Sequence, residues 1–179
     1  MKRLAFATCA ALAVGFVACD PSSPAIAASG STAPHCRAPE YRQFDFWLGD
    51  WDTYRVNKPG QPSVARNRVT SILGGCVLFE VYERNDGYTG ESFTTYDATR
   101  KLWHQSWVTN EGELLVAEGT QQGKRIVLTG ASRDAKGESL LKVSWEPQAD
   151  GVREIAEESR DGGKTWTPSF DILFRPHSG

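Results

Sequence analysis

The sequence predicts an all-β protein, with roughly ten antiparallel strands closed into an up-and-down barrel. Three observations support this prediction. Turn-forming groups of Gly, Pro, Asn and Asp recur at short intervals from Lys58-Pro59-Gly60 to Asp161-Gly162-Gly163. Between them lie runs of about 7 to 11 residues that are rich in Val, Ile, Thr, Trp and Tyr. No stretch after Gly49 has the 3.6-residue hydrophobic period of an amphipathic helix.

The expected strands follow one another without a long connection. We expect them to begin near Trp51, Val64, Val77, Gly90, Lys101, Leu114, Lys124, Ser139, Val152 and Thr165. Short turns join consecutive strands into an antiparallel meander. A flat sheet of this length would leave two long edges, and closure into a barrel removes them. A barrel of this size has room for a small ligand.

The first residues predict an export signal. Lys2-Arg3 is a basic start, and the uncharged run from Leu4 to Ala18 is too short to span a bilayer comfortably. Ala25-Ile26-Ala27 is a small-x-small cleavage site, which gives a signal peptide at residues 1–27 and a soluble exported protein.

A second cleavage site competes with the first. Phe16-Val17-Ala18-Cys19 resembles a bacterial lipobox, which gives a signal peptide at 1–18 and a lipid anchor on Cys19. Both alternatives place the protein outside the cytoplasm, in the periplasm or anchored to the membrane on its periplasmic side. Any membrane contact is then through the lipid alone.

A linker rich in Pro, Ser and Ala is expected at residues 28–40, followed by the β-barrel domain at 41–176. The net charge of the chain is −2, which excludes a strong electrostatic attraction to nucleic acid. We therefore expect no nucleic-acid partner.

The cysteines predict one disulfide. Cys9 is removed with the leader, and Cys19 is either removed or lipidated, so Cys36 and Cys76 remain. In an oxidising compartment two remaining cysteines favour a pair. The alternative is two unrelated free thiols.

Five segments carry a resemblance to a known group of proteins. They are an FDFWLGDW opening, a GGC-hydrophobic-E strand, a G-x-S-x-x-x-YD strand, a W-x-Q-x-WV strand and a DGG-x-TW-x-x-x-FD ending, at 44–51, 74–80, 90–97, 103–108 and 161–171. Together they resemble uncharacterised exported bacterial proteins of lipocalin-like (calycin) type. The resemblance covers nearly the whole mature domain, and it implies the fold but no activity.

A broader calycin resemblance lies in Gly49-x-Trp51 and Arg175. It implies that the Arg175 guanidinium lies across the Trp51 ring as a cation–π contact and closes the barrel floor. We also expect Phe44 to Leu48 to form a short helical turn that caps this end, because aromatic residues are dense before the first strand.

Residues 159–166 fit the pattern S-x-D-x-G-x-T-W and resemble the Asp-box of sialidases. Propellers carry several copies of this motif, one for each blade, whereas this chain has one copy and too few residues for a propeller. We therefore interpret the segment as a rigid β-hairpin without sialidase activity.

The candidate binding site lies on three consecutive strands in the middle of the chain. Period-2 alternation gives each strand one face that combines aromatic and hydrogen-bonding side chains. We expect these faces to converge on one cavity that binds a small apolar or aromatic molecule, through Glu80, Tyr82, Thr94, Tyr96, Trp103, Gln105 and Trp107. The alternative is that the opposite faces fill the core, through Val77, Phe79, Val81, Leu102, Ser106 and Val108.

Two other functions remain open. In a barrel enzyme, such as an isomerase or hydrolase acting on a hydrophobic substrate, Glu80 could be an acid or base, but nothing fixes a second catalytic group beside it. A structural envelope protein would have a packed core without ligand. The spacing of His35, His104 and His177 does not suggest zinc, and His177 at the chain end does not favour haem. We therefore expect no catalytic residue, metal or cofactor.

Overall fold

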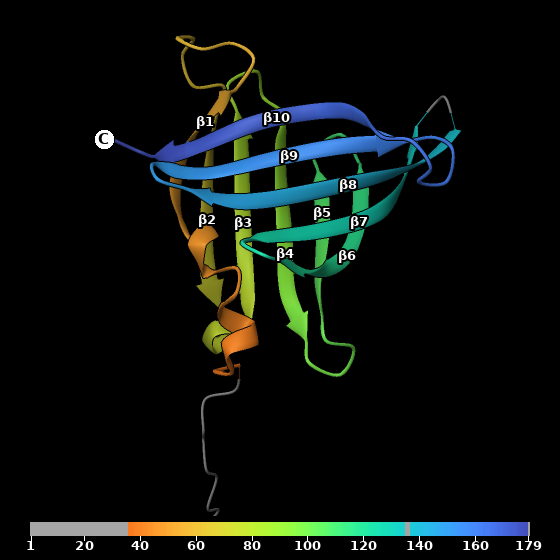
Figure 1. The fold of residues 1–179 in the computed structure, drawn as a ribbon. Helices are drawn as coiled ribbons and strands as arrows, with labels where there is room; N and C mark the ends of the chain where they lie inside the picture. Colours follow the sequence, from red (N-terminus) through yellow and green to blue (C-terminus); the bar gives the residue numbers. More distant parts are fainter. Residues whose placement is uncertain (1–35, 135–136, 179) are drawn as a thin grey trace, which may run out of the picture. The chain divides into compact units, whose positions relative to one another are not determined.

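The computed structural model describes residues 36–134 and 137–178. They form ten antiparallel strands that close into a barrel (Figure 1), which confirms the predicted fold class. Each strand begins within two residues of its predicted start. The strands are β1 (Gly49–Arg55), β2 (Ala65–Ile72), β3 (Val77–Arg84), β4 (Thr89–Asp97), β5 (Leu102–Thr109), β6 (Leu114–Gln122), β7 (Arg125–Asp134), β8 (Gly137–Gln148), β9 (Gly151–Ser159) and β10 (Thr167–Pro176).

The strands follow one another around the barrel in sequence order, so every pairing but one joins consecutive strands. The exception is β1 with β10, where Thr53 pairs with Phe174 and Asp52 with Arg175. This seam leaves no free sheet edge. The predicted signal peptide, with its two cleavage sites and Cys19, lies outside the described residues.

The core lies inside the barrel because alternate side chains of each strand point inward. Its buried apolar side chains form one cluster, which includes Val69, Leu128, Val143, Trp145 and Phe174. Aromatic rings contribute the largest buried surfaces, so they account for much of the hydrophobic stabilisation of the fold.

One end of the barrel is closed by a segment that we call the plug, residues 39–48. It contains the 3-10 helices η1 (Pro39–Arg42) and η2 (Asp45–Trp47), which lie at the lower end in Figure 1. Phe44 and Trp47 are completely buried and stack with ring centroids 5.1 Å apart. The Phe44 ring also contacts Trp103 and Trp145. The predicted helical cap is therefore confirmed.

The Gly-x-Trp motif follows the plug, and the structure gives its physical reason. A Cβ on Gly49 would lie 2.5 Å from the indole of Trp51, so only glycine allows this ring to lie across the start of β1. The Trp51 indole N–H donates a hydrogen bond of 3.0 Å to the carbonyl oxygen of Trp47. The motif thus fixes the plug to the first strand.

The expected contact between Trp51 and Arg175 is wrong. Arg175 pairs with Asp52, so its side chain lies on the outer face, whereas Trp51 points inward. The Arg175 guanidinium lies 5.7 Å from the ring centroid of Tyr54 and 3.2 Å from the Asp150 carboxylate. The plug closes this end of the barrel without a cation–π contact on Trp51.

The predicted disulfide between Cys36 and Cys76 is present, with Cα atoms 5.1 Å apart. Cys76 follows the 3-10 turn η3 (Leu73–Gly75), which connects β2 to β3. The Arg42 guanidinium donates a hydrogen bond to the Gly75 carbonyl. These two connections hold the start of the plug against the β2–β3 turn.

The Asp-box segment between β9 and β10 is a turn centred on Asp161. This carboxylate accepts hydrogen bonds from the backbone N–H groups of Lys164 and Thr165 and from the hydroxyls of Ser159 and Thr165, at 2.7 to 3.0 Å. They lower the pKa of Asp161 to about 2. The Trp166 indole N–H donates to the Gly163 carbonyl at 3.1 Å. The segment is therefore a turn held by its own side chains, as the structural interpretation predicts.

Candidate ligand-binding cavity

A cavity of about 730 Å³ opens at the end of the barrel opposite the plug. Residues of the connections β1–β2, β3–β4 and β5–β6 and of the end of β7 contribute to its mouth, and side chains from most strands line its interior. The interior side chains are Glu80, Tyr82, Gln105, Trp107, Leu115, Leu141, Val143, Trp145, Glu154, Ile172 and Phe174.

All seven predicted binding residues lie on the inner faces of β3, β4 and β5. Four of them line the cavity: Glu80, Tyr82, Gln105 and Trp107. The other three lie deeper or beside the plug. Thr94 and Trp103 are buried, and Tyr96 packs against Tyr41 and Trp103. A role in binding remains a prediction for the four residues that line the cavity. For Thr94, Tyr96 and Trp103 the geometry gives no support for such a role.

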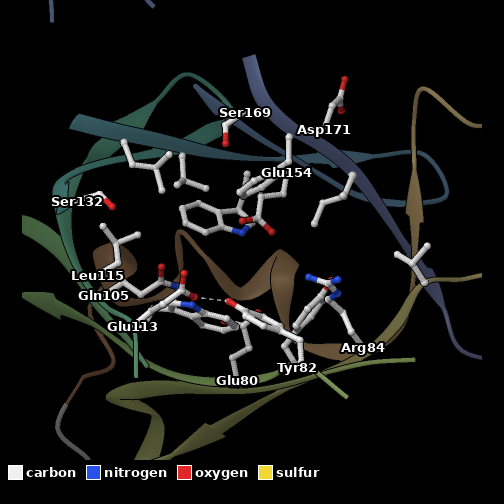
Figure 2. A pocket seen from close by; sticks show the side chains of 18 of the residues that line it. Glu80, Tyr82, Arg84, Gln105, Glu113, Leu115, Ser132, Glu154, Ser169 and Asp171 are labelled. Carbon is white, nitrogen blue, oxygen red and sulfur yellow. Dashed lines mark hydrogen bonds between the residues drawn. The ribbon is translucent and has the colours of Figure 1, made fainter. Parts of the chain in front are cut away.

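The opposite wall of the cavity contains residues that were not predicted from the sequence. This wall comes from β8, β9 and β10 and includes Trp145 and Glu154, which face each other as a cross-strand pair. Figure 2 shows Glu154 reaching into the cavity from this wall, across from Glu80, Tyr82 and Gln105. A usable signal existed in β9, where Glu154 takes an inward position between the buried residues Val152 and Ala156.

A chain of hydrogen bonds supports Glu80 from two neighbouring strands. The Ser92 hydroxyl donates to the Glu80 carboxyl at 2.7 Å. The Gln105 amide nitrogen donates to the hydroxyls of Ser92 and Thr94, at 3.4 and 3.1 Å. Glu80 on β3 pairs with Ser92 on β4, and Gln105 on β5 pairs with Thr94 one inward position along β4, so the inward face holds the carboxyl in one orientation.

Burial raises the pKa of Glu80 to about 7, because its carboxyl is only 5 % exposed and the ionised form loses its hydration. The Ser92 hydroxyl and the nearby amide of Asn67 favour the ionised form and partly offset this effect. Glu80 therefore changes its charge near neutral pH.

Burial also raises the pKa of Glu154, and the neighbouring charge of Glu80 raises it further. The nearby Trp145 indole favours the ionised form to a smaller extent. The indole N–H of Trp145 is itself buried and has no hydrogen-bond partner among the residues described. The cavity therefore contains two neighbouring carboxyls, with the Trp145 indole N–H near Glu154.

Aromatic rings form much of the remaining wall. The ring of Trp107 lies across Gly90, where a Cβ would come within 2.2 Å of it. The Tyr82 ring packs edge-on against Trp107, with centroids 6.1 Å apart. Burial raises the pKa of Tyr82 to about 12, so its hydroxyl stays neutral at physiological pH.

The charged side chains at the mouth are largely occupied with one another. Arg84 forms an ion pair with Asp86 and lies over the Tyr88 ring, 5.0 Å from its centroid. The Tyr88 hydroxyl donates to the Glu113 carboxylate at 2.9 Å. Arg133 pairs with Glu138. The mouth is therefore polar, whereas the interior is mainly apolar apart from the two carboxyls and Gln105.

In residues 36–134 and 137–178, no three His, Cys, Asp or Glu side chains gather in a way that could hold a metal ion. Within the same ranges, no helix has the length and apolar character needed to cross a bilayer. The chain matches no protein-family model, and no curated protein is significantly similar to it. Fold and cavity together define the class: a closed up-and-down β-barrel with an internal cavity open at one end.

Proposed function

We propose that this barrel binds a small, mainly apolar or aromatic molecule in its internal cavity. The observation that carries the proposal is the 730 Å³ cavity, which is lined by Tyr82, Trp107 and Trp145, the last of which packs on Trp47 of the plug. This volume, and an interior with aromatic and aliphatic side chains beneath a polar mouth, are compatible with a small-molecule site. A structural protein with a fully packed core does not fit such a cavity.

The proposed location is outside the cytoplasm. The basic and apolar leader and the lipocalin-like resemblance support export, with or without a lipid on Cys19. The disulfide between Cys36 and Cys76 is consistent with an oxidising compartment. A carrier for apolar molecules is useful there, since such molecules are poorly soluble between membranes.

Two experiments test binding. Native mass spectrometry of the exported protein should detect a co-purifying small molecule. Titration with the neutral apolar dye N-phenyl-1-naphthylamine should show saturable fluorescence enhancement. We expect Trp107→Ala to weaken dye binding about tenfold or more, because the substitution removes a cavity wall.

The matched control is Val108→Ala, the next residue on β5, whose side chain is 47 % exposed on the outer wall. It should leave dye affinity unchanged. Equal affinity of all three proteins, or no saturable binding, would rule out the cavity as the binding site.

A second candidate function is catalysis, and the Glu80–Glu154 pair favours it. Two coupled carboxyls with raised pKa values can divide the roles of base and acid, as isomerases and hydrolases require. Turnover of a co-purified ligand that is lost in both Glu80→Gln and Glu154→Gln would support this candidate. Recovery of the ligand unchanged after long incubation would leave binding alone.

A further inference from the structure

We propose that the ligand is a protonated primary amine with an apolar or aromatic body, and that its ammonium group binds between Glu80 and Glu154. This inference rests on the proposed function, because it names the class of ligand that the same cavity accepts.

The cavity carboxyls lack a positively charged partner. Glu80 is buried and Glu154 is half-buried in the same cavity, and carboxyls withdrawn from water are normally paired with a cation. Among the described residues, neither forms an ion pair, and the nearest cationic side chains in the cavity lining, Arg55, Arg84 and Arg133, lie at the mouth. A ligand ammonium would supply the missing positive charge.

The second argument is hydrogen bonding. An ammonium group donates three hydrogen bonds. Glu80 and Glu154 offer carboxyl oxygens, and Gln105 offers a third acceptor. The Gln105 amide nitrogen is committed to Ser92 and Thr94, whereas its carbonyl oxygen accepts no hydrogen bond from the described residues. Three acceptors from β3, β5 and β9 therefore line one cavity.

The aromatic side chains of the cavity also favour a cation. A cation near the faces of tryptophan and tyrosine rings is attracted by their π-electrons, and more strongly in a desolvated site. Trp107, Trp145 and Tyr82 line the cavity with the carboxyls. The unpartnered indole N–H of Trp145 can donate to an acceptor on the ligand body, such as a hydroxyl or ring oxygen.

Other ligand charges fit less well. A carboxylate ligand would be repelled by Glu80 and Glu154 once either is ionised. A neutral ketone or alcohol would accept a hydrogen bond from a protonated carboxyl. It is therefore the main alternative to an ammonium ligand. The two differ in pH dependence, because an ammonium needs the ionised carboxylate and a neutral acceptor needs the protonated carboxyl.

The sign of this dependence follows from the groups around Glu80. Uncharged partners face it from β2 and β4, namely Asn67 and Ser92, and the uncharged Gln105 lies on β5. The ionisable groups in the same lining are Glu154, Glu113, Asp171, Tyr82, Tyr88, Arg55, Arg84 and Arg133, and both tyrosines have pKa values raised to about 12. Between pH 5.5 and 8 Glu80 ionises, and Glu154, whose pKa is raised further by the charge of Glu80, is the second carboxyl that can lose its proton. Amine affinity rises over this range.

The experiment compares 2-phenylethylamine, 2-phenylethanol and phenylacetate by isothermal titration calorimetry at pH 5.5 and 8. At pH 8 the amine should bind at least about tenfold more tightly than the alcohol, and phenylacetate should not bind. Amine affinity should rise about tenfold or more from pH 5.5 to 8, while alcohol affinity stays level or falls.

Glu80→Gln keeps the shape of the side chain and removes its charge. It should reduce amine affinity at pH 8 about tenfold and weaken the pH dependence, whereas alcohol affinity should not fall, because the Gln amide can still donate a hydrogen bond. The matched control is Glu91→Gln, on the outer face of β4, which should change neither. Circular dichroism and the unfolding midpoint show that each variant is folded.

An alcohol that binds as tightly as the amine, or amine binding that weakens with rising pH, would overturn the inference. If the neutral dye still binds, the proposed function survives that result. If neither the dye nor any of the three compounds binds, both proposals fail together.

Discussion

The indole of Trp107 lies across the backbone of Gly90, so closely that a Cβ on Gly90 would stand 2.2 Å from the ring. The two residues lie on adjacent strands, and Trp107 pairs with Ser92, two positions along β4. The glycine therefore makes room for a ring that would otherwise be pushed into the cavity. A larger side chain at position 90 would therefore reduce the volume of the cavity.

Gly90→Ala tests this relationship. We expect it to lower the free energy of unfolding by about 1–3 kcal/mol, the usual cost of overpacking, and to weaken dye binding. In the background of Trp107→Leu the same substitution should cost much less, because the smaller side chain can move away. Urea denaturation of the four proteins gives the coupling energy. Purely additive costs would show that the two residues do not interact as described.

Trp103→Ala should destabilise the fold more than Trp107→Ala does. Trp103 is 2 % exposed, packs against Phe44 and Tyr96, and donates its indole N–H to Gln43 at 3.1 Å. Its truncation should cost about 3–5 kcal/mol, as for other buried large-to-small changes. Trp107 borders the open cavity, so its loss leaves less unfilled core. Unfolding curves in urea measure the loss of stability in both variants. A smaller loss for Trp103→Ala than for Trp107→Ala would contradict this prediction.

Removal of the disulfide should destabilise the protein by about 4 kcal/mol, because the unfolded chain regains the entropy of a loop closed over 40 residues. The double substitution Cys36→Ser with Cys76→Ser should lower the unfolding midpoint, and reductant should not lower it further. Reductant should lower the midpoint of the unaltered protein. Two reactive thiols in the non-reduced exported protein would contradict the pairing.

Glu80 should make stability depend on pH. Its folded-state pKa of about 7 lies above the ordinary value of 4.5, so the folded protein binds this proton more tightly than the unfolded chain. The resulting stabilisation is complete below about pH 4.5 and is lost as the pH rises through about 7. It amounts to about 3 kcal/mol for a shift of this size.

Glu80→Gln removes this dependence, so the stability advantage of the variant over the unaltered protein should grow from pH 5 to pH 8. Taking the difference between the two proteins at each pH cancels the contributions of other titrating groups. Parallel stability curves would indicate that Glu80 is hydrated in solution.

Much of the fold was predictable because its signals are local. Turn residues mark the strand starts, and period 2 identifies the inward faces of β3 to β5. The alternation within a strand predicts which face a residue lies on, but not whether it lies near the plug or near the cavity. Trp103 and Trp107 share one face of β5, about 13 Å apart at the usual rise per residue. The first meets the plug and the second the cavity, because the plug enters at the end where β5 begins.

Trp145 and Glu154 were not predicted for a different reason. Trp145 and Glu154 oppose β3 to β5 only because β1 pairs with β10 and closes the sheet, and alternation within one strand does not show what lies across the lumen. The error at Arg175 is one of register. A shift of one residue moves a side chain to the other face, and Arg175 pairs with Asp52 rather than Trp51.

The seam between β1 and β10 also has a kinetic consequence. Consecutive strands can pair as soon as each hairpin exists, whereas Thr53 cannot meet Phe174 until the last strand has been made or delivered. Until then the chain has two unpaired edges, on β1 and β9, and edges of this kind recruit strands from other molecules. Pairing of the ten residues of β10 with both β1 and β9 removes these two edges together.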